Sequence, residues 1–158
     1  MARLKENYEG NGFFGIGILN NANTFNVGTL WRSAYILGAS FIFTVIKKYK
    51  PQTSDVTKTW TKIPLYHYTS VDDLKSNLPH STKLIGVELT AESIPIVEFQ
   101  HPLRAVYLLG NERIGLSETI LQECEDVVSL PGDFSLNVSV AGSILMYDRV
   151  AKIKRMKA

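Results

Sequence analysis

Apolar residues gather in short continuous runs along the chain, and these runs alternate with segments of helical periodicity. The runs predict buried strands at residues 13–19, 41–46, 83–87, 105–109 and 127–130. Apolar positions three and four residues apart predict helices at residues 26–37, 71–78, 117–124 and 137–152. Strands that are apolar throughout are typical of a parallel sheet with both faces covered. The pattern therefore predicts an α/β fold with a mostly parallel sheet and helices on both faces.

Turn and cap residues mark where several of these elements begin and end. Gly38 follows the first helix as a C-cap, and Ser117 precedes the third helix as an N-cap. The Pro131-Gly132-Asp133 turn ends the last strand, and either Ser135 or Asn137 can cap the helix after it. The small residues early in this final helix suit the close approach of another backbone or of a ligand.

Length and composition narrow the class of protein. A chain of 158 residues with 45% hydrophobic residues is expected to form one domain, residues 1–158. No apolar run is long enough to span a membrane, and the N-terminus lacks the apolar region of a signal peptide. Cys124 is the only cysteine, which excludes an internal disulfide and is compatible with a reducing, cytoplasmic location. Because the histidines and this cysteine lack zinc spacing, we expect no metal site.

Positive charge is modest overall but clustered. The net charge is +2, and residues 47–66, which show no periodicity, are predicted to form a long loop that is functional or disordered. Basic residues with interleaved aromatics lie in this loop, and more basic residues lie at the C-terminus: Lys47, Lys48, Tyr49, Lys50, Lys58, Trp60 and Lys62, then Lys152, Lys154, Arg155 and Lys157. Such clusters can contact phosphates and bases, but solvated charges and cations at a helix C-terminus explain them equally well.

Three segments carry polar residues at the ends of predicted elements. They are residues 26–34 after a polar run, residues 108–117 around Gly110-Asn111-Glu112, and residues 130–142, which contain Ser135-x-Asn137. Together they resemble, in order and spacing, motifs 1, 2 and 3 of the SpoU (TrmH-like) family of the SPOUT superfamily, the RNA ribose 2′-O-methyltransferases. The resemblance covers about residues 13–147.

The resemblance implies properties that the residue pattern alone does not. It implies a SPOUT-type fold with a deep C-terminal trefoil knot, whereas the pattern of elements predicts an unknotted, doubly wound sheet. It also implies S-adenosyl-L-methionine as the cofactor, RNA as the partner, and methyl transfer to a ribose 2′-hydroxyl. tRNA is the expected substrate and rRNA the alternative. The expected assembly is a homodimer whose active sites use residues of both chains.

Catalytic residues are implied by the same resemblance: Asn26 and Arg32 from motif 1, Glu112 from motif 2, and Ser135 and Asn137 from motif 3. Arg32 would bind the phosphate and stabilise the developing alkoxide. A general base is the harder role for it, because a guanidinium normally stays protonated. Glu112 would orient Arg32 or its counterpart in the partner subunit. The alternative interpretations are a surface ion pair for Arg32 and an acid at a helix N-terminus for Glu112.

The cofactor is expected at three loops that follow strand ends, where backbone groups would bind the adenine. By position the residues are Val87, Glu88, Leu89, Leu109, Gly110, Asn111, Leu130, Ser135, Leu136 and Asn137. Gly110 is expected to permit close approach to the ligand. Two features depart from the family pattern. The loop from Leu130 to Ser135 is about three residues shorter, and Arg113 replaces the glycine that commonly follows the motif 2 glutamate.

Two other classes of protein fit the sequence less well than an RNA methyltransferase does. A noncatalytic RNA-binding module with the same fold would not need to retain the polar set. A nucleotide-binding α/β protein would need a glycine-rich loop after a strand, but residues 10–15 precede one. Attack by the Cys124 thiol would give base methylation, so this residue is assigned to a helix core.

The chain is expected to be a minimal family member, because only twelve residues precede Phe13 and no appended RNA-binding domain is expected. A dimer interface is expected along the final helix, with Ser139, Gly142 and Ser143 allowing close helix approach. The apolar residues assigned to that interface are Val138, Ala141, Ile144, Leu145 and Val150. Periodicity alone does not separate this interface from packing within the domain.

Overall fold

The strands form one parallel sheet that places the carboxyl ends of all its strands at a common edge. The computed structural model describes residues 12–50 and 62–157, with side chains up to residue 154. In the described chain, seven strands pair in the order β3-β2-β1-β6-β4-β7-β5, and every pair is parallel. The bounds are β1 (Phe13–Leu19), β2 (Phe41–Val45), β3 (Leu65–Tyr68), β4 (Lys83–Val87), β5 (Ile94–Pro95), β6 (Arg104–Leu109) and β7 (Asp126–Ser129).

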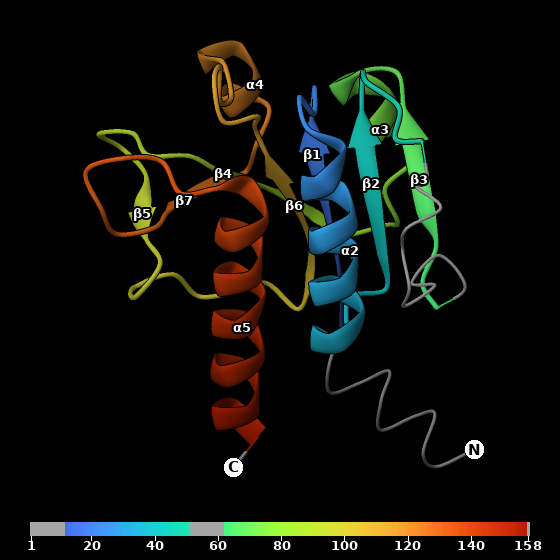
Figure 1. Ribbon diagram of the computed structural model, residues 1–158. Coiled ribbons are helices and arrows are strands. Elements are labelled where there is room, and N and C mark those ends of the chain that lie inside the picture. The colour runs from blue at the N-terminus through green and yellow to red at the C-terminus, as the bar shows by residue number, and fades with distance from the viewer. Residues whose placement is uncertain (1–11, 51–61, 158) are drawn as a thin grey trace.

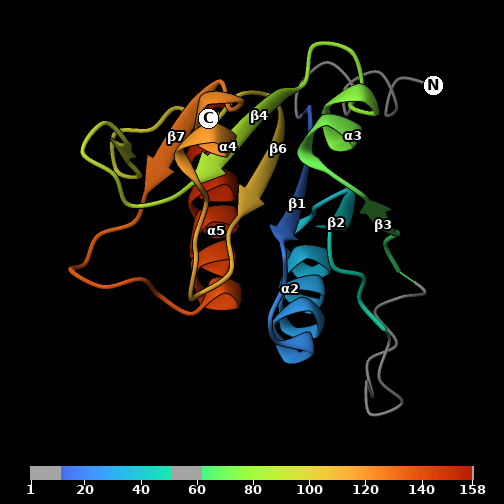
Figure 2. The ribbon, with the colours of Figure 1, turned by 90° about the horizontal axis from the view of Figure 1, so that it is seen from above.

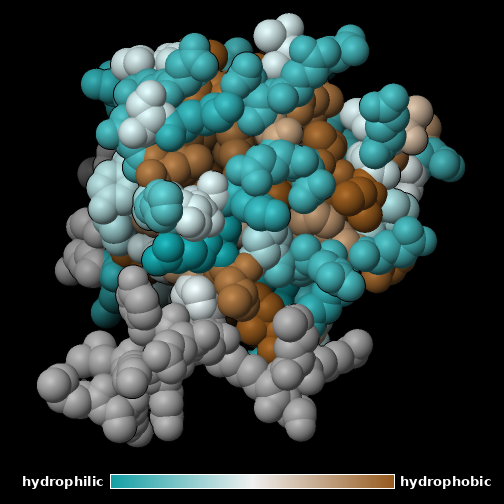
Figure 3. All heavy atoms as spheres, turned by 180° about the vertical axis from the view of Figure 1, so that it is seen from behind, coloured by the Kyte–Doolittle hydropathy of each residue, from teal (hydrophilic) through white to brown (hydrophobic). Residues whose placement is uncertain are grey.

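Helices cover both faces of this sheet, so the predicted α/β architecture is confirmed. On one face α2 (Thr24–Leu37) and α5 (Val138–Lys157) pack side by side (Figure 1). On the other face α3 (Val71–Ser76) and α4 (Glu118–Gln122) pack on the sheet, as the view from above shows (Figure 2). Seen from behind, this second face carries hydrophobic patches among hydrophilic side chains (Figure 3).

Alternate side chains of the central strands enter two separate cores. Ile16 on β1 and Tyr107 on β6 belong to the core beneath α2 and α5, whereas Val106 and Leu108 belong to the core beneath α3 and α4. This division follows from the two-residue period of a strand. Both sides of β6 are buried after its first residue, Arg104, which explains why the remaining five residues are apolar or aromatic.

Two glycines make room for aromatic rings on the α3 and α4 side of β1. A Cβ atom at Gly15 would lie 2.4 Å from the Phe41 ring, and one at Gly17 would lie 2.4 Å from the Phe43 ring. Larger residues at either position would displace these rings from the second core.

Cap residues set the helix boundaries largely as the sequence predicts. Asn23 caps α2 by accepting from the N–H of Phe25, and Gly38 ends this helix with a φ of 88°. Ser117 caps α4, as predicted. Asn137, rather than Ser135, caps α5, because its Oδ1 accepts from the N–H groups of Ser139 at 3.0 Å and Val140 at 3.3 Å.

Two strands were missed by the sequence pattern. β3 begins at Leu65, so the prediction of a loop through residue 66 is wrong at its last two residues. The two-residue β5 pairs with β7 through Ile94 and Pro95. Residues 51–61, including Lys58 and Trp60 of the basic stretch, lie outside the described residues.

A buried polar network fastens α5 to the chain between β5 and β6. Arg149, only 2% exposed, donates to the backbone carbonyls of Pro102, Leu103 and Phe13 at 2.5, 2.9 and 3.4 Å, and to the Tyr107 hydroxyl at 3.1 Å. It also lies over the Phe14 ring at 5.0 Å. This guanidinium thus ties the final helix to β1, β6 and the segment before β6.

The network continues from Tyr107 through His101 to Asp148. His101 Nδ1 lies 2.6 Å from the Tyr107 hydroxyl, and Nε2 lies 2.8 Å from Asp148 Oδ2. Burial lowers the pKa of His101 and raises the pKa of Tyr107 to about 12. A neutral His101 with its proton on Nε2 donates to Asp148 and accepts from the Tyr107 hydroxyl.

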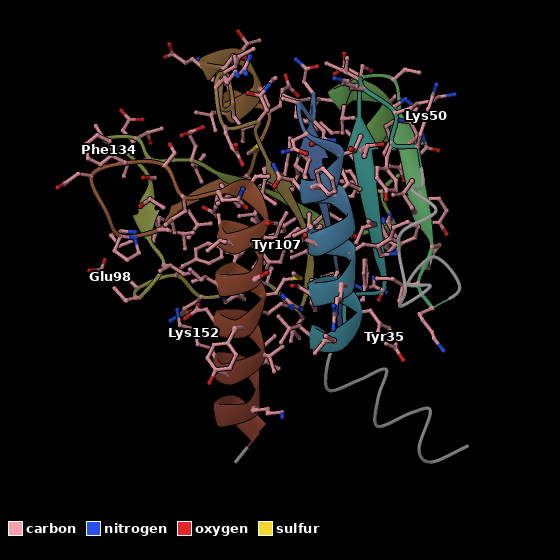
Figure 4. The ribbon with its side chains drawn as sticks, in the orientation of Figure 1. Tyr35, Lys50, Glu98, Tyr107, Phe134 and Lys152 are labelled. Carbon is pink, nitrogen blue, oxygen red and sulfur yellow. The ribbon has the colours of Figure 1, made fainter. Side chains whose placement is uncertain are left out.

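Lys152 completes this network rather than contributing to a free basic end. Its ammonium group pairs with Asp148 at 2.8 Å and donates to the backbone carbonyls of Ile96 and Phe99. The labelled Lys152 projects from α5 toward the chain below β5 (Figure 4). Of the predicted basic cluster, Lys154 is exposed, and the side chains of Arg155 and Lys157 are outside the described ones.

The small residues of α5 serve its packing on α2. A Cβ atom at Gly142 would lie 2.5 Å from Leu30, and the Ser143 hydroxyl donates to that of Ser33 at 2.9 Å. These two residues are therefore explained by packing within the domain, and an interface between subunits along α5 stays a prediction. Of the apolar residues expected at that interface, Val138, Ala141 and Leu145 are buried in the domain's own core, Val150 is half-buried, and Ile144 is exposed.

Candidate active site

Loops at the carboxyl ends of β4, β6 and β7 enclose a cavity at the edge of the sheet. The start of α5 closes it with Val138 and Ala141. Nine of the ten residues expected at the cofactor line it, namely Val87, Glu88, Leu89, Leu109, Gly110, Asn111, Leu130, Ser135 and Leu136. The carboxyl edge of a parallel sheet is where α/β proteins bind their ligands.

Three predicted catalytic side chains from distant parts of the chain meet beside this cavity. The Asn26 amide donates to Glu112 Oε1 at 3.0 Å, and the Asn137 amide donates to the same oxygen at 2.7 Å. The Asn137 amide also donates to Asn26 Oδ1 at 3.0 Å. We call these three residues the polar cluster. It joins α2, the turn after β6 and the N-terminus of α5.

Glu112 also serves the N-terminus of α5. Its Oε1 accepts from the backbone N–H of Val138 at 3.4 Å, so the negative charge lies where the helix dipole favours it. Glu112 therefore both stabilises the N-terminus of α5 and belongs to the polar cluster. Its second oxygen, Oε2, has no hydrogen-bond donor among the described residues and is open to a ligand.

A second, more polar cavity lies on the other side of the polar cluster. It is lined by Asn21, Ala22, Asn23, Thr24 and Asn26 before and within α2, and by Asn111, Glu112, Arg113 and Val138. The last four residues line both cavities. Glu112 therefore stands between a cavity with a mixed polar and apolar lining and a second, more polar one.

The turn after β6 is shaped by side chains that the sequence did not assign to that role. Asn111 Oδ1 accepts from the N–H groups of Arg113 and Ile114, while its amide donates to the Asn20 carbonyl. A Cβ atom at Gly110 would lie 2.3 Å from the Gly115 backbone. The absence of a side chain at Gly110 is thus explained by contact within the turn, although Gly110 also lines the cavity.

Glu88 ties the loop after β4 to the turn after β6. Its two carboxylate oxygens accept from the N–H groups of Leu89 at 3.0 Å and Leu116 at 2.9 Å. Gly115 adopts a φ of 65°, and a Cβ atom there would lie 2.4 Å from Glu88 Oε2. The Glu88 side chain, for which no role was predicted, holds two walls of the cavity together.

Arg32 and Ser135 are placed differently from the polar cluster. Arg32 is exposed on α2, lines neither cavity, and makes no ion pair or hydrogen bond with any described residue, Glu112 included. The alternative of a surface ion pair therefore has no partner in the described chain. Ser135 is exposed and lines the first cavity.

Several cavity residues were missed by the sequence analysis. Phe134, 88% exposed, lies in the loop between β7 and α5 that projects beyond the sheet (Figure 4), and Ile114, 71% exposed, lies in the turn after β6. In the sequence, each of these two is a large apolar residue within a turn of mostly polar residues and glycine, and this pattern could have indicated a cavity wall. Arg113, noted only as a departure from the family pattern, lines both cavities.

The remaining reactive groups lie away from the cavities. Burial raises the pKa of the Cys124 thiol to about 11, so it stays protonated at neutral pH. Its assignment to a helix core is wrong, because α4 ends at Gln122 and Cys124 lies half-buried in the turn after it. Tyr49 packs on Trp31 as an edge-to-face pair, which leaves its ring half-buried. Within residues 12–50 and 62–157, no group of three His, Cys, Asp or Glu side chains could hold a metal ion. No helix in these ranges is long and apolar enough to cross a membrane.

Solved structures share this fold. The TrmH/SpoU tRNA modifying enzyme of A. aeolicus superposes with a TM-score of 0.80 at 21% identity, over 99% of this chain and 85% of its own. The SpoU methyltransferase AviRb of Streptomyces viridochromogenes, in complex with AdoMet, gives 0.77 at 22% identity, over 94% and 62%. At these identities the likenesses show that the chain shares the fold of these enzymes.

Residues 16–147 match the model of the SpoU rRNA Methylase family, and the chain belongs to that family. It is 37% identical over 68 residues to mouse tRNA (guanosine(18)-2′-O)-methyltransferase TARBP1, covering 41% of this chain and 4% of the relative. It is 25% identical to tRNA (cytidine/uridine-2′-O-)-methyltransferase TrmJ of Pectobacterium atrosepticum, covering 90% and 66%. It is 32% identical to mitochondrial rRNA methyltransferase 1 of Schizosaccharomyces pombe, covering 79% and 47%. The chain thus spans less than two thirds of each of these relatives.

Proposed function

We propose that this chain is an S-adenosylmethionine-dependent RNA methyltransferase that methylates a ribose 2′-hydroxyl, with tRNA as its substrate. One observation carries the proposal. The polar cluster of Asn26, Glu112 and Asn137 stands between a cavity that suits an adenosine and a polar cavity that suits a nucleotide. Family membership and relatives named as tRNA and rRNA 2′-O-methyltransferases support it.

The first cavity fits the cofactor in its chemistry. Aliphatic side chains from three strand ends, Val87, Leu109 and Leu130, form walls that suit the faces of an adenine ring. Backbone groups of the same loops lie at its edge, where they can bind the ring nitrogens. Bound S-adenosylmethionine supplies a methyl group that is activated by a sulfonium.

The chain's own residues then hold and orient the substrate hydroxyl. Glu112 Oε2 can accept a hydrogen bond from a hydroxyl, while Oε1 is held by the two amides of the polar cluster. The carboxylate is therefore fixed before the substrate arrives. Orientation of this kind accounts for much of the acceleration in a displacement reaction.

Arg32 is proposed to act in the site of the partner subunit. It has no ionic partner among the described residues, and it lies on the outer face of α2 with exposed apolar neighbours. On α2, Phe25 and Ile36 are 67% and 68% exposed, and on α5, which packs on α2, Ile144 and Tyr147 are also exposed. An exposed apolar surface of this kind is typical of a protein interface, so we propose a homodimer formed through α2 and α5.

Methyl transfer from tritiated S-adenosylmethionine, followed by nucleoside analysis, tests the activity. Label should enter 2′-O-methylated nucleosides of tRNA; label in rRNA alone would support the alternative substrate.

Arg32→Ala should abolish most transfer and leave cofactor affinity nearly unchanged, because Arg32 lines neither cavity. Lys83→Ala, which removes an exposed cation at the opposite strand end, is the control. An Arg32→Ala enzyme with half of normal turnover would contradict the assignment, and a wild-type chain that binds no cofactor would refute the function.

Light scattering should give twice the 17.7 kDa of the chain. Ile36→Asp should produce monomers, whereas Val97→Asp, at a 76% exposed site between β5 and β6, should not. Mixing inactive Arg32→Ala with inactive Asn137→Ala should restore about a quarter of the activity, because half of the dimers are mixed and each holds one intact site. No recovery in verified mixed dimers would show that Arg32 acts within its own chain.

We also propose the deep trefoil knot of the SPOUT-type fold. Its support is family membership and the packing of α5 against the chain between β5 and β6 through Arg149 and Lys152. Stretching the protein by its termini tests it, since a knotted chain stays shorter at full extension than about 3.3–3.6 Å per residue allows. One domain over residues 1–158 and a cytoplasmic location stay predictions of the sequence.

A further inference from the structure

Arg113 is the one basic side chain that lines either cavity in the described parts of the chain, and it lines both. The turn that carries it is well fixed. Asn111 Oδ1 accepts from the Arg113 N–H at 2.9 Å and from the Ile114 N–H at 2.8 Å. The backbone of Arg113 is therefore anchored at the boundary between the cavities.

The guanidinium of Arg113 has no protein partner among the described residues. Neither of the two acids of the first cavity pairs with it. Glu88 accepts from two backbone N–H groups, and Glu112 Oε1 accepts from Asn26, Asn137 and the N-terminus of α5. A guanidinium is permanently charged and presents its donors in a planar fork that matches carboxylate and phosphate groups.

We propose that Arg113 binds an anionic oxygen pair of the ligands and so sets their position relative to the polar cluster. The pair belongs either to the carboxylate of the cofactor's methionine moiety or to a phosphate of the target nucleotide. Both present the same chemistry at the place where the two cavities meet. The inference rests on the proposed function and adds a positioning residue to it.

Calorimetry with two compounds related to the cofactor tests whether Arg113 binds its carboxylate. S-adenosylhomocysteine has the carboxylate, and 5′-methylthioadenosine lacks it. If Arg113 binds this group, Arg113→Gln should weaken S-adenosylhomocysteine by about ten- to hundredfold, the effect of losing a hydrogen bond to a charged group. The affinity for 5′-methylthioadenosine should stay the same.

RNA binding measured at several salt concentrations tests whether Arg113 binds a phosphate of the target nucleotide. If Arg113 binds this group, Arg113→Gln should raise the KM for RNA, spare kcat and S-adenosylhomocysteine affinity, and reduce the slope of log K against log salt by about one. Arg113→Lys should then restore most RNA affinity, because lysine also binds phosphate as a point charge. Lys83→Gln, an exposed cation outside both cavities, is the matched control.

The inference is overturned if Arg113→Gln changes neither S-adenosylhomocysteine nor RNA binding relative to Lys83→Gln. It is also overturned if both cofactor fragments weaken equally, since that shows a distorted loop rather than a lost anion contact. Wild-type protein that binds S-adenosylhomocysteine in these experiments leaves the proposed function standing. Wild-type protein that binds none refutes that function separately.

Discussion

Replacing Arg149 with methionine should be among the most damaging single changes in the chain. Methionine keeps much of the length and apolar stem but removes the guanidinium. Three backbone carbonyls and the Tyr107 hydroxyl then lose their donor inside the protein. Water has little access, because Arg149 is 2% exposed.

The magnitude follows from these contacts. Each hydrogen bond to a charged group contributes about 1.5–3 kcal/mol, and an unsatisfied buried acceptor costs about 1–3 kcal/mol. Removal of the guanidinium also ends its own desolvation, which offsets part of the loss. We expect a net loss of about 3 kcal/mol, which corresponds to a fall in Tm of about 6–12 °C for a domain of this size.

Equilibrium unfolding in urea measures this loss directly. Lys154→Met on the exposed side of the same helix is the control and should change stability by no more than about 0.5 kcal/mol. Arg149→Lys should fall between the two, since an ammonium group can reach only some of the four acceptors. A loss below about 1 kcal/mol for Arg149→Met, with the slope of the urea transition unchanged, would refute the claim that the guanidinium fastens α5.

Three further predictions concern pH, the cavity wall and the thiol. Since burial lowers the pKa of His101 below its usual 6.5, stability should be complete above pH 6.5 and fall as the pH drops toward the folded-state pKa. Urea midpoints at pH 7.5 and 5.5 should show this, and a His101→Gln variant with an undiminished pH dependence would disprove it. Gly115→Ala should cost about 1–3 kcal/mol and weaken cofactor binding, because the new Cβ meets Glu88 at a positive φ; Gly38→Ala, with a positive φ but nothing within 4 Å, isolates the backbone contribution. The Cys124 thiol, with a pKa of about 11, should react slowly with iodoacetamide at pH 8 until urea unfolds the chain; equal rates in both states would contradict its burial.

The sequence pattern predicted the longer elements because their signals repeat several times within each element. β1 is apolar over its whole length, β6 is apolar or aromatic after Arg104, and α2 places a buried residue at nearly every turn. β3 and β5 were missed for the opposite reason. β3 has four residues, none of them fully buried, and β5 has two residues, one of them Pro95, so neither is long enough to show a period.

The residues of the candidate site also differ in how far the sequence could predict them. In the polar cluster, Asn26 is 86 residues from Glu112 and 111 residues from Asn137, and only the family motifs indicated that they meet. Arg149 escaped notice, because its partners are mostly backbone carbonyls, which any residue supplies and no pattern marks. The dimer residues predicted on α5 were partly wrong, since apolar periodicity does not say which neighbour a helix face packs against.

The contacts of the Asn137 side-chain oxygen and nitrogen determine how deamidation of this residue would change the protein. Its oxygen accepts from Ser139 and Val140 at the start of α5, while its nitrogen lies 2.7 Å from the Glu112 carboxylate. Deamidation to aspartate would preserve the acceptors, and the added negative charge would favour the helix dipole. It would also set two carboxylates in contact, and such a pair has to share a proton. An aged molecule would therefore keep its helix cap but lose the two hydrogen bonds that the amide donates, and the polar cluster would become sensitive to pH.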